Sequence, residues 1–353
     1  MVRVLAADGW ECHVVFPRPS PLAAAFEAAG AGVHVVPMRR LTRSGDLGYY
    51  AGYLALWPVT VFRLARLVVG LGIDVVHSNS LHSLYGWAAA ALTRRPHVWH
   101  AREIVVQSDA ALRLERWLAR RFATRVLCVS GAVAAQLRGR HVMVVHDALG
   151  PEDGFSPNRA GHFRARVGLS DDVPLVGAAG RIDTWKGFDV LLDAVPFLHG
   201  LRPEAAVVVA GDAVPNKERY AEELARRAGT VPGVHWLGPR DDMAELLADL
   251  DVFVLASTEP EPFAAVLVEA IASGVPVAAT DHGGSPEMLS SLPGDRAALF
   301  SPRDPEALAA AVASLLPPGP SDADRRRRRT GRFVGDPAAF ARVFDQVLAE
   351  SGR

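Results

Sequence analysis

Four polar side chains in the second half of the chain have types and spacings that suit an anionic, hydroxyl-rich ligand. Arg181 and Lys186 are five residues apart, and seven residues separate Glu261 from Glu269. A guanidinium and an ammonium at a strand-to-helix turn, together with unpaired backbone N–H groups, can hold a diphosphate. Carboxylates accept hydrogen bonds from paired sugar hydroxyls. Taken alone, the two cations fit a solvated loop equally well, but the carboxylate pair favours a ligand site.

Short β-branched runs alternate with longer Ala/Leu/Arg-rich segments along the whole chain. This pattern is typical of buried parallel strands joined by helical crossovers, and it predicts an α/β fold. A polar segment at residues 150–160 separates two such series, which predicts two doubly wound domains with a cleft between them. Strands are expected at residues 12–16, 32–37, 74–78, 97–102, 125–130, 142–146, 175–179, 206–210, 234–237, 252–256, 275–280 and 297–300. Helices are expected at residues 21–29, 54–69, 81–93, 110–123, 132–138, 188–198, 218–228, 243–248, 266–272 and 337–350.

The composition excludes several classes of protein. The 353 residues include 38 Lys and Arg against 39 Asp and Glu, so no basic excess indicates nucleic acid. Cys12 and Cys128 cannot form a disulfide framework. The first residues lack a secretory pattern, and the uncharged stretch at residues 48–62 is interpreted as a helix with an apolar face, too short to span a membrane. A cytoplasmic protein is therefore expected.

Several other patterns are interpreted as structural. Gly30-Ala31-Gly32 lacks the third glycine of a dinucleotide fingerprint. Asp249 and Asp251 have the spacing of a metal-binding pair, but they lie where a helix ends and a strand begins, where Asp is a common turn residue. The nearby histidines lack zinc-ligand spacing, so no metal is expected: they are His77, His82, His97 and His100. The arginine run at residues 325–329 is interpreted as a solvated turn.

Residues 176–305 resemble the C-terminal domain of family 4 glycosyltransferases, which have the GT-B fold. The matching stretches are Gly180-Arg181, Lys186-Gly187, residues 208–212, Leu237-Gly238, Ser257, Glu261 with Glu269-Ala270, Gly274-Val275-Pro276-Val277, Gly283-Gly284 and Glu287. The first half is similar at residues 74–80, Trp99-His100-Ala101-Arg102-Glu103 and Val129-Ser130. The resemblance implies two Rossmann-like domains facing a central cleft. Residues 1–152 would form the acceptor side, residues 153–335 would bind the nucleotide sugar, and residues 336–353 would be a helix that could return to the first domain.

The resemblance also implies the reaction and its residues. A retaining, hexosyltransferase-type enzyme would transfer sugar from a nucleotide-diphosphate sugar to a glycan, lipid-linked or small-molecule acceptor, without a metal or another cofactor. The residues expected to be catalytic are His100, which would face the transferred sugar, and Arg181, Lys186 and Glu261, which would hold the diphosphate and the donor sugar. The expected donor-binding set is Gly180, Arg181, Lys186, Arg240, Glu261, Glu269 and the residues Phe263, Ala264, Ala265 and Val266.

Two departures from the family pattern keep a non-catalytic relative that binds a nucleotide or a partner open as an alternative. Ala264 replaces the usual glycine, and its methyl group would penalise a positive φ. Residues 2–9 are interpreted as the end of a helix leading into the strand at 12–16, so the family's opening strand and glycine-rich loop are expected to be missing. A sugar-nucleotide epimerase is a third possibility, but no further paired carboxylates support it.

A basic amphipathic segment also raises membrane contact. Residues 110–125 interleave arginines with Leu112, Leu114, Trp117, Leu118 and Phe122. Such a helix can lie on anionic lipid, although a domain helix with solvated arginines explains the same pattern. Together with the apolar residues 48–62, it predicts a peripheral contact with the membrane and a lipid-linked acceptor.

Overall fold

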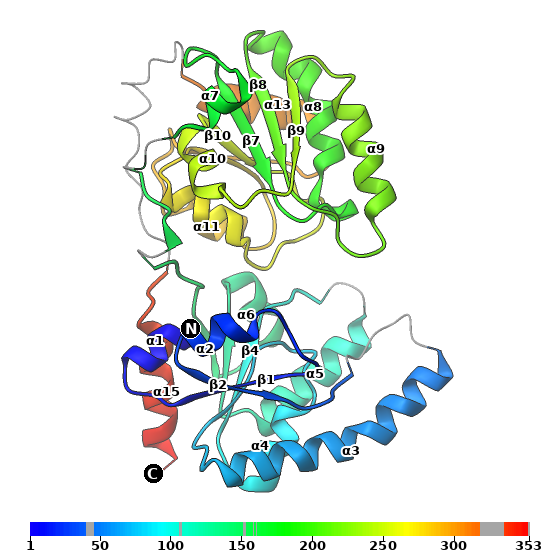
Figure 1. Ribbon diagram of the computed structural model, residues 1–353, viewed down its shortest axis with the longest axis vertical. Helices are drawn as coiled ribbons and strands as arrows, with labels where there is room; N and C mark the ends of the chain where they lie inside the picture. Colours follow the sequence, from blue (N-terminus) through cyan, green and yellow to red (C-terminus); the bar gives the residue numbers. More distant parts are fainter. Residues whose placement is uncertain are drawn as a thin grey trace. The chain divides into compact units, whose positions relative to one another are not determined.

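The computed structural model describes residues 1–39, 46–105, 108–150, 153–157, 159, 161–317 and 335–351. The chain forms two compact units (Figure 1). Unit 1 contains Met1–His146 together with Asp336–Arg353, and unit 2 contains Asp147–Gly335. The chain therefore crosses from unit 1 to unit 2 and returns. The arginine run at residues 325–329 lies outside the described residues.

Unit 1 is built around a parallel four-stranded sheet with the order β3-β4-β5-β6. Its strands are β3 (Val76–Ser78), β4 (His97–Ala101), β5 (Arg125–Cys128) and β6 (Val142–Val144). The helices are α1 (Val2–Ala7), α2 (Ala23–Ala28), α3 (Leu47–Gly70), α4 (Gly86–Thr93), α5 (Asp109–Phe122), α6 (Gly131–Leu137) and α15 (Ala339–Glu350). The predicted alternation of strand and helix is confirmed in this unit.

Two further strands of unit 1 stand apart from that sheet. β1 (Cys12–Phe16) and β2 (Ala31–Val35) pair in parallel with each other, and the described hydrogen bonds do not join them to β3. The predicted helical segment before β1 is confirmed as α1, which excludes a strand at residues 2–6. The missing opening strand itself stays a prediction.

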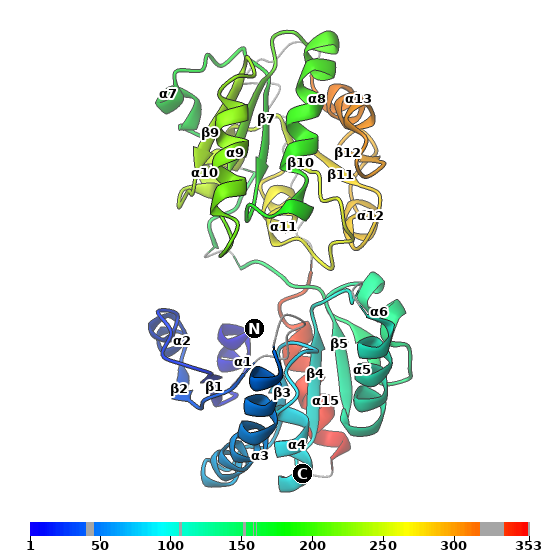
Figure 2. The same cartoon turned by 90° about the vertical axis from the view of Figure 1, so that its right-hand side faces the viewer.

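The C-terminal helix α15 completes the core of unit 1. Phe340 and Phe344 lie in one buried cluster with Val98 of β4 and Leu127 of β5. Figure 2 shows α15 beside β4, far from it in sequence but packed against the same sheet. Residues at opposite ends of the chain therefore share one hydrophobic core.

Unit 2 is a parallel six-stranded sheet with the order β12-β11-β10-β7-β8-β9. The strands are β7 (Leu175–Ala179), β8 (Ala206–Ala210), β9 (Val234–Gly238), β10 (Val252–Leu255), β11 (Val277–Thr280) and β12 (Ala297–Phe300). The helices are α7 (Phe163–Val167), α8 (Phe188–Leu201), α9 (Glu218–Ala228), α10 (Met243–Asp249), α11 (Ala265–Ala272), α12 (Ser285–Leu289) and α13 (Pro305–Leu315). Buried apolar clusters cover both faces of the sheet, as expected for a doubly wound domain.

The strand order of unit 2 reverses between β7 and β10. The chain runs from β7 through β8 to β9 on one side, and from β10 through β11 to β12 on the other. In open parallel sheets, ligands bind at the carboxyl ends of the strands at this kind of reversal. A ligand site is therefore expected at the loops after β7 and β10.

Asp249 and Asp251 have a structural role. Both bind Arg164, which is 2% exposed: its backbone N–H donates to Asp249 Oδ2 at 2.9 Å, and its Nη2 lies 2.8 Å from Asp251 Oδ2. Asp251 also accepts from the N–H of Leu175 at 2.8 Å. These carboxylates anchor α7 to the start of β7, in agreement with the interpretation of the pair as structural.

The apolar helix of the first half is longer than the sequence indicated. α3 has 24 residues and begins at Leu47, because the Asp46 side chain caps it by accepting from the N–H of Tyr49 at 2.7 Å. The expectation that this stretch is too short to span a membrane is wrong on length: α3 is long and apolar enough, by composition, to cross one. Only 28% of its most apolar window is buried in the structure.

Candidate functional site

Three loops meet the carboxyl edge of the unit 2 sheet around the strand reversal. They follow β7, β10 and β11, and β10 pairs with both β7 and β11. The first loop carries Arg181 and Lys186, the second Glu261, and the third Gly283 and Gly284. The predicted residues of these loops are therefore brought to one edge of one sheet by neighbouring strands.

Glu261 connects all three loops. Its carboxylate pairs with Lys186 from the loop after β7 and accepts from the hydroxyl of Ser257 at 2.6 Å, within its own loop. Its backbone carbonyl accepts from the N–H of Gly284, in the loop after β11, at 2.8 Å. Glu261 is 6% exposed, so these contacts compensate for the burial of its polar groups. The same carboxylate that was predicted to meet the donor sugar therefore also holds the loops in register.

The ammonium of Lys186 lies between two partners. It pairs with Glu261, and its Nζ lies 4.4 Å from the centroid of the Trp185 ring. The Trp185 carbonyl in turn accepts from the N–H of Thr258 at 2.7 Å, which joins the loops after β7 and β10 a second time. Trp185 and Ser257 are contributors to the site for which the sequence analysis had assigned no role.

Two glycines let these loops approach each other closely. Gly187 has a φ of +71°, and a Cβ there would lie 1.9 Å from the carbonyl oxygen of Ala256. Gly283 has a φ of +63°, and its Cβ would lie 2.3 Å from the Glu261 carbonyl oxygen. A side chain at either position would push the loops apart.

Helix α11 presents its N-terminus in the same loop as Glu261. It starts at Ala265 with Ala264 as N-cap, and no side chain caps it. The first N–H groups of a helix have no partner within it and favour an anion. Ala264 has a φ of −85° and its methyl group is buried in the core, so the expected strain of alanine at this position does not arise.

Glu269 lies one turn after Ala265 on the same face of α11, because residues i and i+4 are neighbours on a helix. Burial raises the pKa of Glu269, and the negative charge of Asp153 raises it further. A half-buried carboxylate beside an open helix N-terminus can accept hydrogen bonds from a ligand that carries both hydroxyl and phosphate groups.

The two arginines of the predicted site differ in their surroundings. Arg181 is exposed just after β7 and makes no ion pair within the described part of the chain. Arg240 follows β9, the edge strand, and its guanidinium binds Asp242 with its Nε 2.7 Å from Oδ1. That hydrogen bond lowers the pKa of Asp242. Arg181 is thus an open cation, whereas Arg240 already has a carboxylate partner.

His100 lies in the core of unit 1. The ring is 1% exposed and packs 5.5 Å from Phe340 and 5.6 Å from His77 between centroids. Neither ring nitrogen has a hydrogen-bond partner among the residues that the structure describes. Burial lowers the pKa of His100 to about 2, with smaller effects of the charges on His77 and Arg102. The ring lies against Phe340 of α15, and the expectation that His100 faces a sugar stays a prediction.

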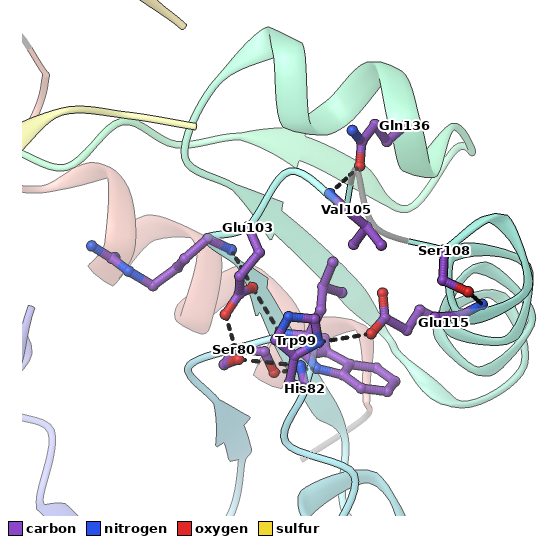
Figure 3. Close-up of polar contacts among 11 residues, drawn as sticks. Ser80, His82, Trp99, Glu103, Val105, Ser108, Glu115 and Gln136 are labelled. Atoms are coloured by element: carbon purple, nitrogen blue, oxygen red, sulfur yellow. Dashed lines mark hydrogen bonds and ion pairs between the residues drawn. The ribbon is translucent and has the colours of Figure 1, made fainter. Parts of the chain in front are cut away.

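Unit 1 has its own polar cluster at the carboxyl ends of β3 and β4 (Figure 3). Glu103 accepts from the hydroxyl of Ser80 and, at 3.1 Å, from the N–H of Leu81. His82 Nδ1 lies 2.9 Å from Oε1 of Glu115, whose side chain is 8% exposed. Ser80 and Glu103 belong to stretches noted in the sequence, whereas the spacing between His82 and Glu115 corresponds to no local pattern.

Among the residues that the structure describes, no three His, Cys, Asp or Glu side chains are arranged to hold a metal ion.

Family models match both units of the chain. Residues 1–148 match a glycosyl transferase 4-like domain, and residues 173–317 match glycosyl transferases group 1. A GDP-mannose-dependent alpha-mannosyltransferase of Mycobacterium tuberculosis is 30% identical over 81% of this chain and 74% of its own length. The lipopolysaccharide core biosynthesis mannosyltransferase LpsB of Rhizobium meliloti is 28% identical over 63% of this chain, which covers 66% of that protein. A D-inositol 3-phosphate glycosyltransferase of Stackebrandtia nassauensis is 34% identical over 60% of this chain, which spans about half, 48%, of that relative.

Solved structures share the fold over nearly the whole chain. HepE from Anabaena, in complex with UDP and glucose, superposes with a TM-score of 0.75 at 24% identity, covering 99% of this chain and 94% of its own. A sucrose-phosphate synthase from Thermosynechococcus elongatus gives a TM-score of 0.73 at 20% identity, covering 99% and 92%. The predicted GT-B fold with two Rossmann-like domains is confirmed. With a relative 30% identical across four fifths of the chain, this protein belongs to the group 1, type 4-like family of glycosyl transferases.

Proposed function

We propose that the protein transfers a hexosyl group from a nucleotide-diphosphate sugar to a hydroxyl group of an acceptor, with retention of configuration. The observation that carries this proposal is the convergence on Glu261 of Lys186, Ser257 and the loop after β11. Relatives named for GDP-mannose and a fold neighbour that binds UDP support a nucleotide sugar as the donor.

Each residue of the site would bind a different part of the donor. Lys186 and the exposed Arg181 would bind the diphosphate, and the open N–H groups of Ala265 and Val266 would bind its oxygens. Glu269 would accept from the ribose hydroxyls, and Glu261 would meet the donor sugar. Gly180, Phe263 and Ala264 would supply backbone contacts in the same loops, and Arg240 would have to exchange Asp242 for the ligand. No metal or further cofactor is part of the proposal.

The reaction breaks the bond between the anomeric carbon and the phosphate oxygen and forms a bond from the acceptor oxygen on the same face of the sugar. The departing nucleoside diphosphate takes the acceptor proton, so no protein base is required. Arg181 and Lys186 stabilise the charge that develops on the leaving group. A role for His100 at the transferred sugar requires its ring to leave Phe340.

A glycan, a lipid-linked sugar or a small metabolite could serve as the acceptor, and unit 1 would bind it. A cytoplasmic location, with unit 1 in peripheral contact with the membrane, agrees with a lipid-linked acceptor. The exposed apolar face of α3 favours this class, because a soluble acceptor gives no reason for it.

Thermal denaturation with UDP, GDP, dTDP and ADP tests the donor site. We expect one nucleotide to raise the melting temperature of the wild type by a few degrees, because ligand at about 100 times its Kd stabilises by about 2.7 kcal/mol. Glu269→Ala should lose the shift, whereas Glu222→Ala, an exposed glutamate on α9, should keep it. If no nucleotide stabilises the wild type, the donor site is wrong. If one does but no nucleotide sugar is hydrolysed or transferred, the non-catalytic alternative holds.

A further inference from the structure

Helix α3 carries an apolar stripe on its exposed face. Leu47, Leu54, Phe62 and Val69 are between 60% and 88% exposed, and they recur every seven or eight residues, which places them on one side of the helix. No charged residue occurs in α3 before Arg63. A helix that packs in a globular protein turns such a stripe toward the core, but here it faces outward.

The opposite face of α3 is fixed in unit 1. Tyr53, Val61 and Val68 are buried there, the hydroxyl of Thr60 donates to the Pro37 carbonyl at 2.7 Å, and Trp57 Nε1 donates to the Leu84 carbonyl at 2.9 Å. These contacts hold α3 against the domain along its length. The helix is therefore positioned to lie along a surface rather than to cross a bilayer.

Exposed apolar side chains also occur on α4 and α5. The Trp57 ring lies 6.1 Å from Trp87 of α4, which lies 4.3 Å from Phe122 of α5, so aromatic contacts join the three helices. Figure 1 shows α3 and α4 side by side, and the two helices pack against each other. The exposed apolar residues that they and α5 add are Leu92, Leu114 and Trp117. We call these side chains, with those of α3, the α3–α5 surface.

The charge on these helices is mainly positive. α3 and α5 contain six arginines, and the acidic residues of α3, α4 and α5 are Asp109 and Glu115, the second of which is buried against His82. The exposed arginines are Arg63, Arg66, Arg113, Arg120 and Arg121. A second copy docked by two-fold symmetry would bring this cationic surface against itself, which is unfavourable. An anionic lipid surface matches both the apolar stripe and the arginines.

We propose that the α3–α5 surface docks on an anionic lipid bilayer, with α3 lying in the interface over about 36 Å, the length of a 24-residue helix. The apolar side chains enter the boundary between headgroups and acyl chains, Trp117 lies at headgroup level, and the guanidinium groups bind lipid phosphates. A lipid-linked acceptor would be brought to unit 1 in this way, a step that rests on the proposed function.

Flotation with lipid vesicles tests the docking without any enzymatic readout. The wild-type protein should float with vesicles of phosphatidylcholine containing about 30% phosphatidylglycerol, and less so with phosphatidylcholine alone. Leu54→Glu with Phe62→Glu should lower the partition coefficient at least about tenfold, because two apolar side chains no longer enter the lipid. Arg113→Ala and Arg121→Ala should each lower it about fivefold and weaken its salt dependence.

A matched pair of substitutions in unit 2 serves as the control. Phe197 and Leu201 are exposed apolar residues of α8, and Phe197→Glu with Leu201→Glu should leave flotation unchanged. The nucleotide-induced rise in melting temperature should survive in both double variants, which separates this proposal from the donor site. Wild-type protein that stays unbound to anionic vesicles overturns the proposal, as does equal flotation of the α3 variant. A dimer that dissociates on the α3 substitutions, without any lipid binding, would assign the surface to a second copy instead.

Discussion

Lys186 and Glu261 are 75 residues apart in the chain and form an ion pair whose side chains are only 10% and 8% exposed. The pair joins the loops that follow β7 and β10, the two strands between which the sheet of unit 2 reverses its order. A bound diphosphate would compete with Glu261 for the ammonium. The pair therefore links the stability of the ligand-free site to the groups proposed to bind the donor.

Removal of Lys186 alone should destabilise unit 2. Breaking a buried ion pair leaves an uncompensated charge, and Lys186→Ala should lower the free energy of unfolding by about 3–5 kcal/mol. In the double variant Lys186→Ala/Glu261→Gln the loss should be smaller than the sum of the losses in Lys186→Ala and Glu261→Gln. Urea denaturation of the four proteins measures this coupling. The exposed pair of Arg227 and Asp193 offers a control, because Arg227→Ala should cost less than about 1 kcal/mol. Strictly additive single effects would contradict the prediction.

Gly187→Ala should disrupt the loop after β7. The new Cβ would lie 1.9 Å from the Ala256 carbonyl oxygen, and a φ of +71° alone costs alanine about 1–3 kcal/mol. Both the melting temperature and the nucleotide-induced shift should fall. Gly200→Ala, near the end of the helix that Gly187 precedes, has open space around the added methyl group and should stabilise by up to about 1 kcal/mol. Equal effects of the two substitutions would show that the close approach at Gly187 is unimportant.

Nucleotide binding should weaken in mild acid through Glu269. Its pKa is raised from the ordinary value of 4.5, chiefly by burial, so protonation begins above that value and removes an acceptor for ribose hydroxyls. Because the folded-state pKa is raised, ionised Glu269 lowers the unfolding free energy of the ligand-free protein at neutral pH. Glu269→Gln should therefore bind nucleotide poorly, with less dependence on pH, yet unfold at a slightly higher temperature. Calorimetric titrations with nucleotide from neutral to mildly acidic pH measure the first effect. Thermal denaturation of the ligand-free wild type and variant measures the second.

Acid should destabilise unit 1 through its buried histidines. Burial lowers the pKa of His77 to about 4, of His97 to about 3 and of His100 to about 2, from an ordinary 6.5. Below pH 6.5 the unfolded chain binds protons that the folded unit does not. The unfolding free energy should therefore fall as the pH drops from 6.5 towards 4, by on the order of 1 kcal/mol per histidine for each pH unit.

The substitution His100→Leu tests two points: that the buried histidines cause the acid destabilisation, and that His100 takes part in catalysis. The variant should show a shallower loss of stability between neutral pH and about pH 5.5 than the wild type, since one of the three histidines is gone. Urea denaturation at both pH values provides the comparison. If the variant also transfers sugar at the wild-type rate, His100 has no part in catalysis, whereas loss of transfer with unchanged stability would return the residue to the reaction.

The strands could be predicted from the sequence because they are buried on both faces, which makes each a continuous run of apolar residues, as at Leu175–Ala179 and Ala206–Ala210. α13 was not predicted although Asp304 caps it and Pro305 opens it, because its alanine-rich sequence has few large apolar residues to mark a helical period. α7 is five residues long, too short for a helical period to show.

The site could be predicted in part for a related reason. Lys186, Glu261 and Glu269 sit at strand ends and in one helix, so their placement follows from local order along the chain. Other features of the site depend on contacts between distant segments or on side-chain conformation. They are the partners of Glu261, the pairing of Arg240 with Asp242, and the packing of α15 against His100. No local periodicity in the sequence encodes such contacts. The surroundings of His100 were the hardest to predict, because they come from the distant helix α15.

The return of α15 to unit 1 has a consequence for how the protein is made. A ribosome releases the strands of unit 1 first, but the phenylalanines that close their core, Phe340 and Phe344, are synthesised only after the whole of unit 2. All the strands of unit 2, and the helices that cover both faces of its sheet, leave the exit tunnel before α15 does. The second half of the nascent chain can therefore reach its native state before the first half, against the direction of translation.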